Sequence, residues 1–378
     1  MKSDAINTDI AIIGGGIAGL WLLNRLRNIG YHALLIESGT LGGGQTIASQ
    51  GIIHGGAKYT LTGKVTPAAQ AVANMPGIWK ACLAGAGEID LRTVQILSQH
   101  QYLWSPGGLG SKITTFFASK MLRNRVTALP PAEYPAIFQT PAFQGSVYEL
   151  AETVLDIPSL LQALVTPCQD ALLQGELNDY NIAAQRYIFT AGAGNEALLP
   201  MQRRPLHMVM VKHKMRTPIY AHCMETSPKP RVTITTHTAA DGDTVWYLGG
   251  QIAESGVNKT EWEQCQAAKI ELEILFPWLD FSSAHSSTQW STLRIDRAEP
   301  LQANGRLPDG VFLQSVDNKI VAWPTKLALA PQLTAEILAL LSKEKIYPKM
   351  GLHINNPTYP SPQIAKPIWD QPQHWLTL

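Results

Sequence analysis

Charge of either sign and long apolar runs are scarce in this sequence. Only 16% of the 378 residues are charged, and their formal net charge is +1. Such a chain has no strong electrostatic attraction for nucleic acid or for an anionic membrane, so we expect neither as a partner. No apolar run approaches the roughly 18 residues of a membrane-spanning helix, and no leader-like segment precedes the first predicted strand. The sequence therefore predicts a soluble, cytoplasmic protein without a transmembrane segment.

Cysteine is equally sparse. The four cysteines, Cys82, Cys168, Cys223 and Cys265, are widely separated and form no C-x-x-C pair. This spacing predicts neither a zinc site nor a redox dithiol, so we expect reduced, structural cysteines and no metal. Apolar residues, by contrast, make up 45% of the chain, and its length suggests two or three domains.

The stretch from Asp9 to Glu37 reads as a strand, a glycine turn, a helix and a second strand. Gly14, Gly16 and Gly19 stand at G-x-G-x-x-G spacing where the helix must begin. These glycines suit a tight turn, close approach of a pyrophosphate and close packing of helix on strand. Glu37 ends the second strand, where an acid can accept hydrogen bonds from ribose hydroxyls. In this unit the predicted dinucleotide contacts are Gly14, Gly16, Ile17, Ala18, Gly19, Glu37 and Ser38. The acid favours an unphosphorylated ribose, hence NAD or FAD.

A second glycine-rich stretch follows, SGTLGGGQTIASQGIIHGGAKYTL, from Ser38 to Leu61. Such glycine density suits a loop whose backbone lies against a flat ligand. A flexible linker is the alternative, but linkers are usually polar throughout, whereas apolar residues are interleaved here.

The opening unit followed by G-G-Q-T-I-A-S-Q-G-I-I-H-G-G resembles the FAD-dependent oxidoreductases of the D-amino-acid oxidase and glycine oxidase superfamily. The S-x-G-I-I-H-G-G run is most similar to the branch of L-2-hydroxyglutarate dehydrogenase and glycerol-3-phosphate dehydrogenase. The resemblance implies an α/β protein, with a glutathione-reductase-type FAD-binding Rossmann domain interleaved with an α+β substrate domain containing a mixed β-sheet. It also implies that Gly43, Gly44, Gln45 and Thr46 lie near the pyrophosphate, and that Ala48, Ser49, Gln50 and Gly51 lie near the isoalloxazine ring.

Two later segments favour FAD over NAD. Tyr187–Thr190 is a predicted strand, and the turn after it, with Ala191 and Gly192, resembles the family's second contact with the dinucleotide. An ordinary strand-to-helix turn is the alternative. The predicted helix at 326–341 can direct its N-terminus at the flavin pyrimidine, which makes Thr325, Lys326 and Leu327 cofactor candidates. The segment Trp323–Lys326 departs from the H-G-x-G type loop of amine-oxidising relatives.

The resemblance also suggests how the chain is divided. We expect the FAD-binding domain at 1–87, 147–204 and 288–345, the substrate domain at 88–146 and 205–287, and a proline-rich tail at 346–378 that wraps the surface. Asp156 should cap a helix that has Pro158 in its first turn. Asp241-Gly242 predicts a hairpin turn. A helix at 259–275 should bury Trp262, Cys265, Ile270 and Ile274, and further helices are expected at 66–85, with a break or kink at Pro76, and at 112–124.

His54 is the leading candidate for the catalytic base, because a near-neutral imidazole stands on the loop expected against the flavin. Ordering of the loop and a covalent histidyl-flavin link are the alternatives. Arg297 is the candidate for binding a substrate carboxylate, with a structural salt bridge to Asp296 or Glu299 as the alternative. Weaker candidates are Arg294, Lys326 and Tyr247, whereas His207, His213 and His222 are expected to be structural or exposed.

These features predict an FAD-dependent oxidoreductase that takes a hydride from a CH-OH or CH-NH group of a small, anionic molecule. A 2-hydroxy acid dehydrogenase-like reaction is the first interpretation and a glycine-oxidase-like amine oxidase the second. A flavoprotein scaffold without catalysis is the alternative of another class. The electron acceptor, oxygen or quinone, and the oligomeric state are left open by the sequence.

Overall fold

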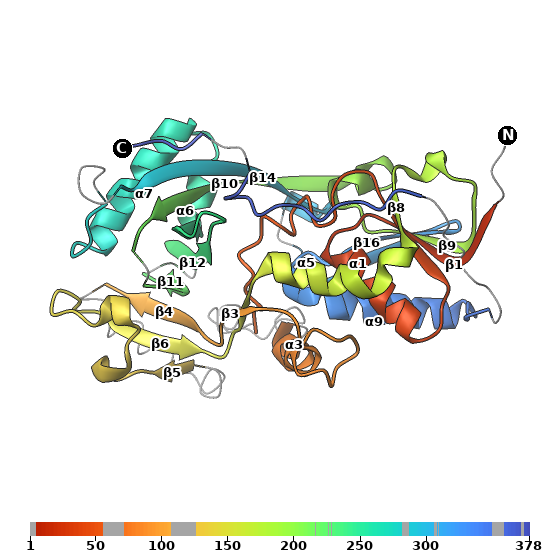
Figure 1. Cartoon of the computed structure of the whole chain (residues 1–378), viewed down its shortest axis with the longest axis horizontal. Coiled ribbons are helices and arrows are strands. Elements are labelled where there is room, and N and C mark those ends of the chain that lie inside the picture. The colour runs from red at the N-terminus through yellow and green to blue at the C-terminus, as the bar shows by residue number, and fades with distance from the viewer. Residues whose placement is uncertain are drawn as a thin grey trace.

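Two β-sheets lie side by side along the long axis of the protein (Figure 1). The computed structural model describes residues 5–55, 72–106, 126–215, 217–225, 227, 229–281, 287–305, 308, 310–349, 359–371 and 374–378. The chain after the second strand passes from one sheet to the other, and so does the C-terminal tail (Figure 1).

The six-stranded sheet has the order β15-β16-β9-β1-β2-β8. Its strands are β1 (Ile6–Ile13), β2 (Ala33–Glu37), β8 (Leu172–Gln174), β9 (Ile182–Phe189), β15 (Phe312–Val316) and β16 (Lys319–Trp323). β1 pairs in parallel with β2 and with β9, and only β15 is antiparallel to its neighbour. Near-continuous apolar runs such as Ile10 to Ile13 suit such a sheet, because both of its faces are covered.

Four helices pack with this sheet in one apolar core. They are α1 (Ile17–Asn28), α3 (Met75–Leu83), α5 (Ile157–Val165) and α9 (Ala330–Lys343). α1 contacts α9 and α5, and the Trp21 ring lies 4.6 Å from that of Trp79 on α3. The strand-helix-strand unit predicted at 9–37 is confirmed, as is the helix cap at Asp156, whose side chain accepts a hydrogen bond from Ser159 N.

The eight-stranded sheet has the order β14-β10-β13-β12-β11-β4-β6-β5. Its strands are β4 (Gln101–Ser105), β5 (Val126–Ala128), β6 (Ser146–Leu150), β10 (Met201–His213), β11 (Ala221–Cys223), β12 (Val232–Thr238), β13 (Thr244–Gly249) and β14 (Gln289–Pro300). β4 and β11 are parallel and the other pairs antiparallel, so the sheet is mixed, as expected. The predicted Asp241-Gly242 hairpin joins β12 to β13. The short strands β3 (Ile96–Ser98) and β7 (Val154–Leu155) form a separate pair.

Sheet membership differs from the predicted division of the chain at two segments. β6 and β14 begin the ranges 147–204 and 288–345 that were assigned to the FAD-binding domain, yet both strands lie in the eight-stranded sheet. All 12 residues of β14 pair with β10, which itself begins before residue 205. Long antiparallel pairing therefore carries β14, with Arg297, into the larger sheet.

The helix α7 (Glu261–Leu275) covers the eight-stranded sheet with a different face from the one predicted. Trp262, Ile270 and Ile274 are 52%, 56% and 59% exposed, so this part of the prediction is wrong. The buried stripe instead contains Cys265 and Leu272. The helix carries apolar residues on two stripes, and only the stripe centred on Cys265 meets the core of the sheet.

Two other predicted helices lie partly or wholly outside the described residues. Residues 72–73 are helical, Asn74 is a turn residue, and α3 begins at Met75 with Pro76 in its first turn, so the helix is interrupted just before Pro76, as predicted. Residues 66–71 and the whole of 112–124 lie outside the described residues. Across the described ranges, no helix has the length and apolar character needed to cross a bilayer.

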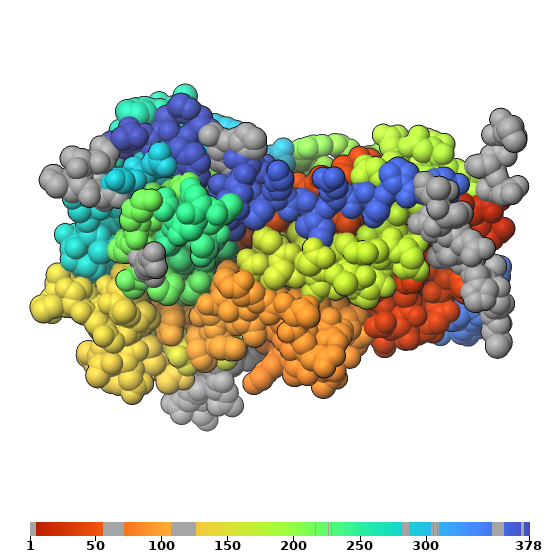
Figure 2. All heavy atoms as spheres, in the orientation of Figure 1, coloured from red at the N-terminus to blue at the C-terminus, as the bar shows by residue number. Residues whose placement is uncertain are grey.

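The C-terminal tail contacts both sheets. Ile364 forms a bridge with Leu41, after β2, and Leu376 forms one with Trp290 in β14. Figure 2 shows this tail as a blue band along one face of the molecule. Part of it is buried rather than superficial, because Trp369 is 5% exposed and stacks on His237 of β12 with the ring centroids 4.1 Å apart.

Candidate functional site

The glycine turn after β1 is close-packed at the first and third glycines of the motif. Gly14 has a φ of +107°, and a Cβ there would lie 2.6 Å from the Cα of Ala191. A Cβ on Gly19 would lie 2.0 Å from the carbonyl oxygen of Gly14. The first and third glycines of the motif are therefore required by conformation and by contact, and the turn from Gly14 to Gly19 touches the second glycine turn at Ala191.

The N-terminus of α1 has the chemistry of an anion site. Its N-cap is Gly16, which makes no side-chain capping bond, and its first turn contains no acidic residue. The nearest atom to a Cβ built on Gly16 is Thr46 Oγ1, at 3.4 Å. Ile17 N donates to that same Thr46 oxygen over 3.0 Å. The structure thus brings Gly16, Ile17 and Thr46 together where the helix dipole favours a phosphate.

Glu37 lies beside this turn. Its Oε2 accepts a hydrogen bond from Gly15 N at 2.7 Å, and its Oε1 accepts one from Gly39 N at 2.7 Å. A carboxylate has about four lone-pair sites, so two backbone donors leave capacity for ribose hydroxyls. The carbonyl of Ser38, next in the chain, accepts from Gln174 of β8.

The second glycine turn meets the first at the same edge of the six-stranded sheet. After β9 the chain enters the 3-10 helix η6 (Gly192–Ala197), and Ala191 N donates to Asn195 Oδ1 over 3.1 Å. Gly192 has a φ of +57°, and the nearest atom to a Cβ there is Gln45 Nε2, at 3.7 Å. Ala191, Gly192 and Gln45, predicted from three separate motifs, therefore lie next to one another.

The loop 48–51 joins the two sheets. The hydroxyl of Tyr247 donates to the carbonyl of Ala48 at 2.9 Å, and the side-chain amide of Gln50 donates to the carbonyls of Thr233 and Tyr247. A Cβ on Gly51 would lie 2.1 Å from the carbonyl oxygen of Leu155. Burial of Tyr247 raises the pKa of its phenol, so it acts here as a neutral donor.

Ser49 in this loop has a buried hydroxyl that finds no hydrogen-bond partner among the described residues. Buried polar atoms are nearly always paired, so an orphaned one is a sign of a group that belongs there. Together with the open helix terminus and the glycine cradle, it shows that the residues present fit a dinucleotide such as FAD.

The third predicted cofactor segment begins the last helix. Thr325 has a φ of +60°, and its hydroxyl donates to the carbonyl of Gly310. Lys326 is the N-cap of the 3-10 helix η8 (Leu327–Leu329), which leads into α9. The helix expected from residue 326 therefore starts with one tighter turn.

His54 is bound to a buried acid that the sequence did not single out. Its Nδ1 lies 3.0 Å from Glu152 Oε2, while Glu152 Oε1 accepts a hydrogen bond from Gly55 N at 2.7 Å. Glu152 is only 3% exposed. His222 on β11 is the third member of this group: one ligand-type atom from each of the three side chains lies within 4.8 Å of the others.

His222 was expected to be structural or exposed. It is 2% exposed, its Nδ1 lies 2.8 Å from Thr233 Oγ1, and its ring is stacked at 6.0 Å from that of His54. His207 and His213 are also buried, and burial lowers both of their pKa values, that of His213 to about 4.

Arg297 lies on the seam between β10 and β14. Its Nε donates to the carbonyl of Arg204 at 3.3 Å, and its Nη2 is 3.9 Å from Glu254 Oε1. Glu299, one of its expected partners, instead pairs with Arg204 at 3.2 Å. Arg294 donates to backbone carbonyls at Val257 and Lys259.

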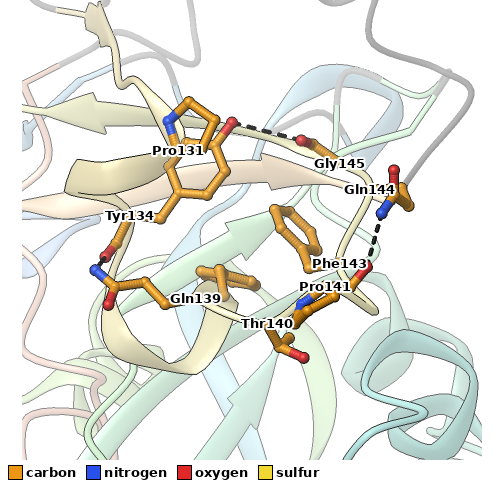
Figure 3. A pocket seen from close by; sticks show the side chains of 9 residues that line it. Pro131, Tyr134, Gln139, Thr140, Pro141, Phe143, Gln144 and Gly145 are labelled. Carbon is orange, nitrogen blue, oxygen red and sulfur yellow. Dashed lines mark hydrogen bonds between the residues drawn. The ribbon is translucent and has the colours of Figure 1, made fainter.

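A separate hollow of about 410 Å³ is formed by the segment that joins β5 to β6, the last two strands in the order of the eight-stranded sheet (Figure 3). Tyr134, Phe138 and Phe143 give it an aromatic wall. The residues that line it all belong to 131–145, so it contains no predicted site residue.

Comparisons with known proteins agree with this geometry. A model of the FAD-dependent oxidoreductase (DAO) family matches residues 9–314. The probable FAD-dependent oxidoreductase PA4991 of Pseudomonas aeruginosa is 48% identical over 97% of this chain and 98% of its own. Its crystal structure superposes with a TM-score of 0.84, at 44% identity over 97% of this chain and 98% of its own.

Two more distant structures share the fold. Glycine oxidase from Geobacillus kaustophilus has a TM-score of 0.64 at 13% identity, over 93% of this chain and 98% of its own. L-α-glycerophosphate oxidase from Mycoplasma pneumoniae, solved with FAD bound, has a TM-score of 0.60 at 11% identity, over 89% of this chain and 95% of its own.

Proposed function

This chain belongs to the family of FAD-dependent oxidoreductases, and we propose that it oxidises a CH-OH group of a small, anionic molecule. FAD, when bound, supplies the hydride acceptor at its N5 atom. The protein must then hold the substrate in place and remove one proton from the substrate oxygen. The observation that carries the proposal is His54, which lies three residues after the loop 48–51 and is held there by Glu152.

The nucleotide would be held by the cradle described above. In this proposal the pyrophosphate lies at the N-terminus of α1, beside Thr46, and the ribose lies at Glu37. The second turn, with Ala191 and Gly192, closes the same edge. Thr325, Lys326 and Leu327 stand at the start of the helix predicted to face the flavin, and their contact with it remains a prediction.

His54 is the proposed proton acceptor for the substrate hydroxyl. Loss of the proton to His54 and of the hydride to FAD converts CH-OH to C=O, so protons and electrons balance. For the substrate anion we propose Arg297, whose side chain is 30% exposed. The planar guanidinium group of Arg297 can bind a carboxylate bidentately.

The test follows the bleaching of FAD absorbance without oxygen, in a panel of 2-hydroxy acids, amino acids and secondary amines. We expect a hydroxy acid to reduce the wild type and His54→Ala to slow that reduction by about 10²–10⁴-fold while FAD stays bound. His100→Ala is the matched control, because His100 pairs with Glu149 at the surface, 42% exposed. Reduction by amines alone would contradict the CH-OH assignment, and reduction by no compound would favour a scaffold.

A further inference from the structure

The acid bound to His54 is placed for chemistry rather than for packing. Glu152 lies two residues after the end of β6, is 3% exposed, and directs both of its oxygens at the segment that contains His54 and Gly55. Burying a carboxylate is unfavourable unless it is hydrogen-bonded or paired with a positive charge. Gly55 N provides one donor, and the imidazole of His54 provides the partner that can also become positively charged.

This contact determines which nitrogen of His54 carries the hydrogen. When Glu152 is ionised it only accepts hydrogen bonds, and Nδ1, 3.0 Å from Glu152 Oε2, is then the protonated nitrogen of the neutral ring. The lone pair is then on Nε2, the atom on the other side of the ring. A carboxylate behind a histidine fixes its tautomer and raises its basicity in the same way at metal and catalytic sites.

His222 limits how much charge this group can hold. Its ring is stacked on that of His54, 6.0 Å between centroids, and its Nδ1 contacts Thr233 Oγ1. Two imidazolium ions so close would repel each other, while the single negative charge of Glu152 balances one of them. Glu152 and His222 are two ionisable groups that the described residues bring against His54.

We propose that Glu152 is a positioning residue that holds His54 in the tautomer with the hydrogen on Nδ1 and the lone pair on Nε2, and that it stabilises the imidazolium once the substrate proton has been taken up. The inference rests on the proposed role of His54. It adds that the negative charge of Glu152, and not only its shape, sets the pH range in which His54 is an acceptor.

The decisive variant is Glu152→Gln, which keeps the size and an acceptor oxygen but removes the charge. Reaction requires unprotonated His54, so the rate of flavin reduction falls on the acid side of the pH profile. Without the carboxylate, His54 loses its proton more readily, and the midpoint of this acid limb should move to lower pH by about 1–3 units. The rate on the plateau should fall by about tenfold or more, because the base is weaker.

Glu149→Gln is the matched control, since Glu149 lies on β6 and pairs with the surface residue His100 at 3.3 Å. It should leave both the midpoint and the plateau unchanged. A purely structural Glu152 would lower the fraction of folded protein in Glu152→Gln without moving the midpoint, which would overturn the proposal. If Glu152→Gln slowed flavin reduction and His54→Ala did not, the role of His54 itself would be overturned.

A second measurement does not depend on turnover. In ¹⁵N-histidine NMR of the FAD-loaded wild type, His54, assigned by its loss in His54→Ala, should show the Nδ1–H tautomer. The Nε2–H tautomer would overturn the proposal even if Glu152→Gln failed to fold. Metal analysis adds a last check, because His54, Glu152 and His222 form a possible cation donor set. A stoichiometric metal that disappears in Glu152→Gln would replace the proton-acceptor role with metal binding.

Discussion

The two sheets contribute to the site in opposite ways. At the edge of the six-stranded sheet the cradle is made largely of backbone, because Gly14, Gly16 and Gly19 lie close together where β1 leads into α1. Glu37, at the end of the strand that follows α1, adds its carboxylate. At the edge of the eight-stranded sheet the contributions are side chains from distant strands, Glu152 after β6 and His222 on β11. The cofactor side is therefore local in sequence, and the chemistry side is assembled only by the fold.

This difference suggests how each side responds to substitution. The glycines of the cradle have no side chain to lose, so at these positions the cradle is disrupted by added atoms. The His54 group depends on charge and hydrogen bonding, so it is disrupted by changes that leave the volume intact, such as Glu152→Gln.

The largest effect on cofactor binding is expected from Gly19→Ala. The new Cβ would meet the Gly14 carbonyl at 2.0 Å and Thr190 Oγ1 at 2.8 Å, and the first of these is backbone that cannot rotate away. We expect a loss of about 1–3 kcal/mol or more in the free energy of unfolding and at least about a hundredfold weaker FAD binding. Urea denaturation and FAD fluorescence titration measure the two effects.

Gly77→Ala provides the control for this variant. Gly77 lies in α3, and a Cβ there meets no atom within 4 Å. Alanine in a helix should stabilise the protein by about 0.5–1 kcal/mol and leave FAD binding unchanged. Equal behaviour of the two variants would show that the close packing of Gly19 on Gly14 has no role in the cradle.

The next largest effect concerns acid and the eight-stranded sheet. Burial lowers the pKa of His237, on β12, to about 3 and that of His213, on β10, to about 4. The unfolded chain therefore binds more protons than the folded one below about pH 6.5. The stability that depends on these neutral rings is complete above that pH and is lost as the pH falls toward 4 and then 3.

At about pH 4 each of these two histidines should lower the free energy of unfolding by on the order of 3 kcal/mol relative to neutral pH. His237→Phe, which keeps an aromatic ring against Trp369, should reduce the drop in urea midpoint between about pH 7 and pH 4. His100→Phe, at a half-buried position, should leave the drop as it is in the wild type. An equally steep drop in His237→Phe would contradict the buried neutral ring.

The contrast between the cofactor side, which is local in sequence, and the His54 group, which the fold assembles, explains what could be predicted from the sequence. The strand-helix-strand unit was predicted correctly because its contacts join near neighbours and because positive φ at Gly14 requires glycine. Glu152 is separated from His54 by 98 positions and is one of several acids in its stretch, so no spacing marks it. Their contact exists because Ile52 pairs with Val154, a bridge that appears only in the folded chain.

Arg297 and α7 show two further limits. The motif around Arg297 suggested the cofactor domain, but strand pairing with β10 carries this residue into the eight-stranded sheet, where it meets Glu254 on the short helix α6 (Gln251–Ser255). In α7 the periodicity correctly predicted a helix but not its orientation, because two stripes of the helix are apolar. Only the packing partner, the eight-stranded sheet, decides which stripe is buried.

The smallest expected effect tests that orientation. Ile270 is 56% exposed on α7, so Ile270→Gln should change the free energy of unfolding by less than about 0.5 kcal/mol. Leu272 lies two residues further along and is fully buried in the core under the sheet. Leu272→Ala should lower the free energy of unfolding by about 2–5 kcal/mol. Urea denaturation of both variants measures the difference. A large cost for Ile270→Gln would mean that the outer face of α7 is covered in the protein in solution, because no neighbour in the described chain accounts for such a loss.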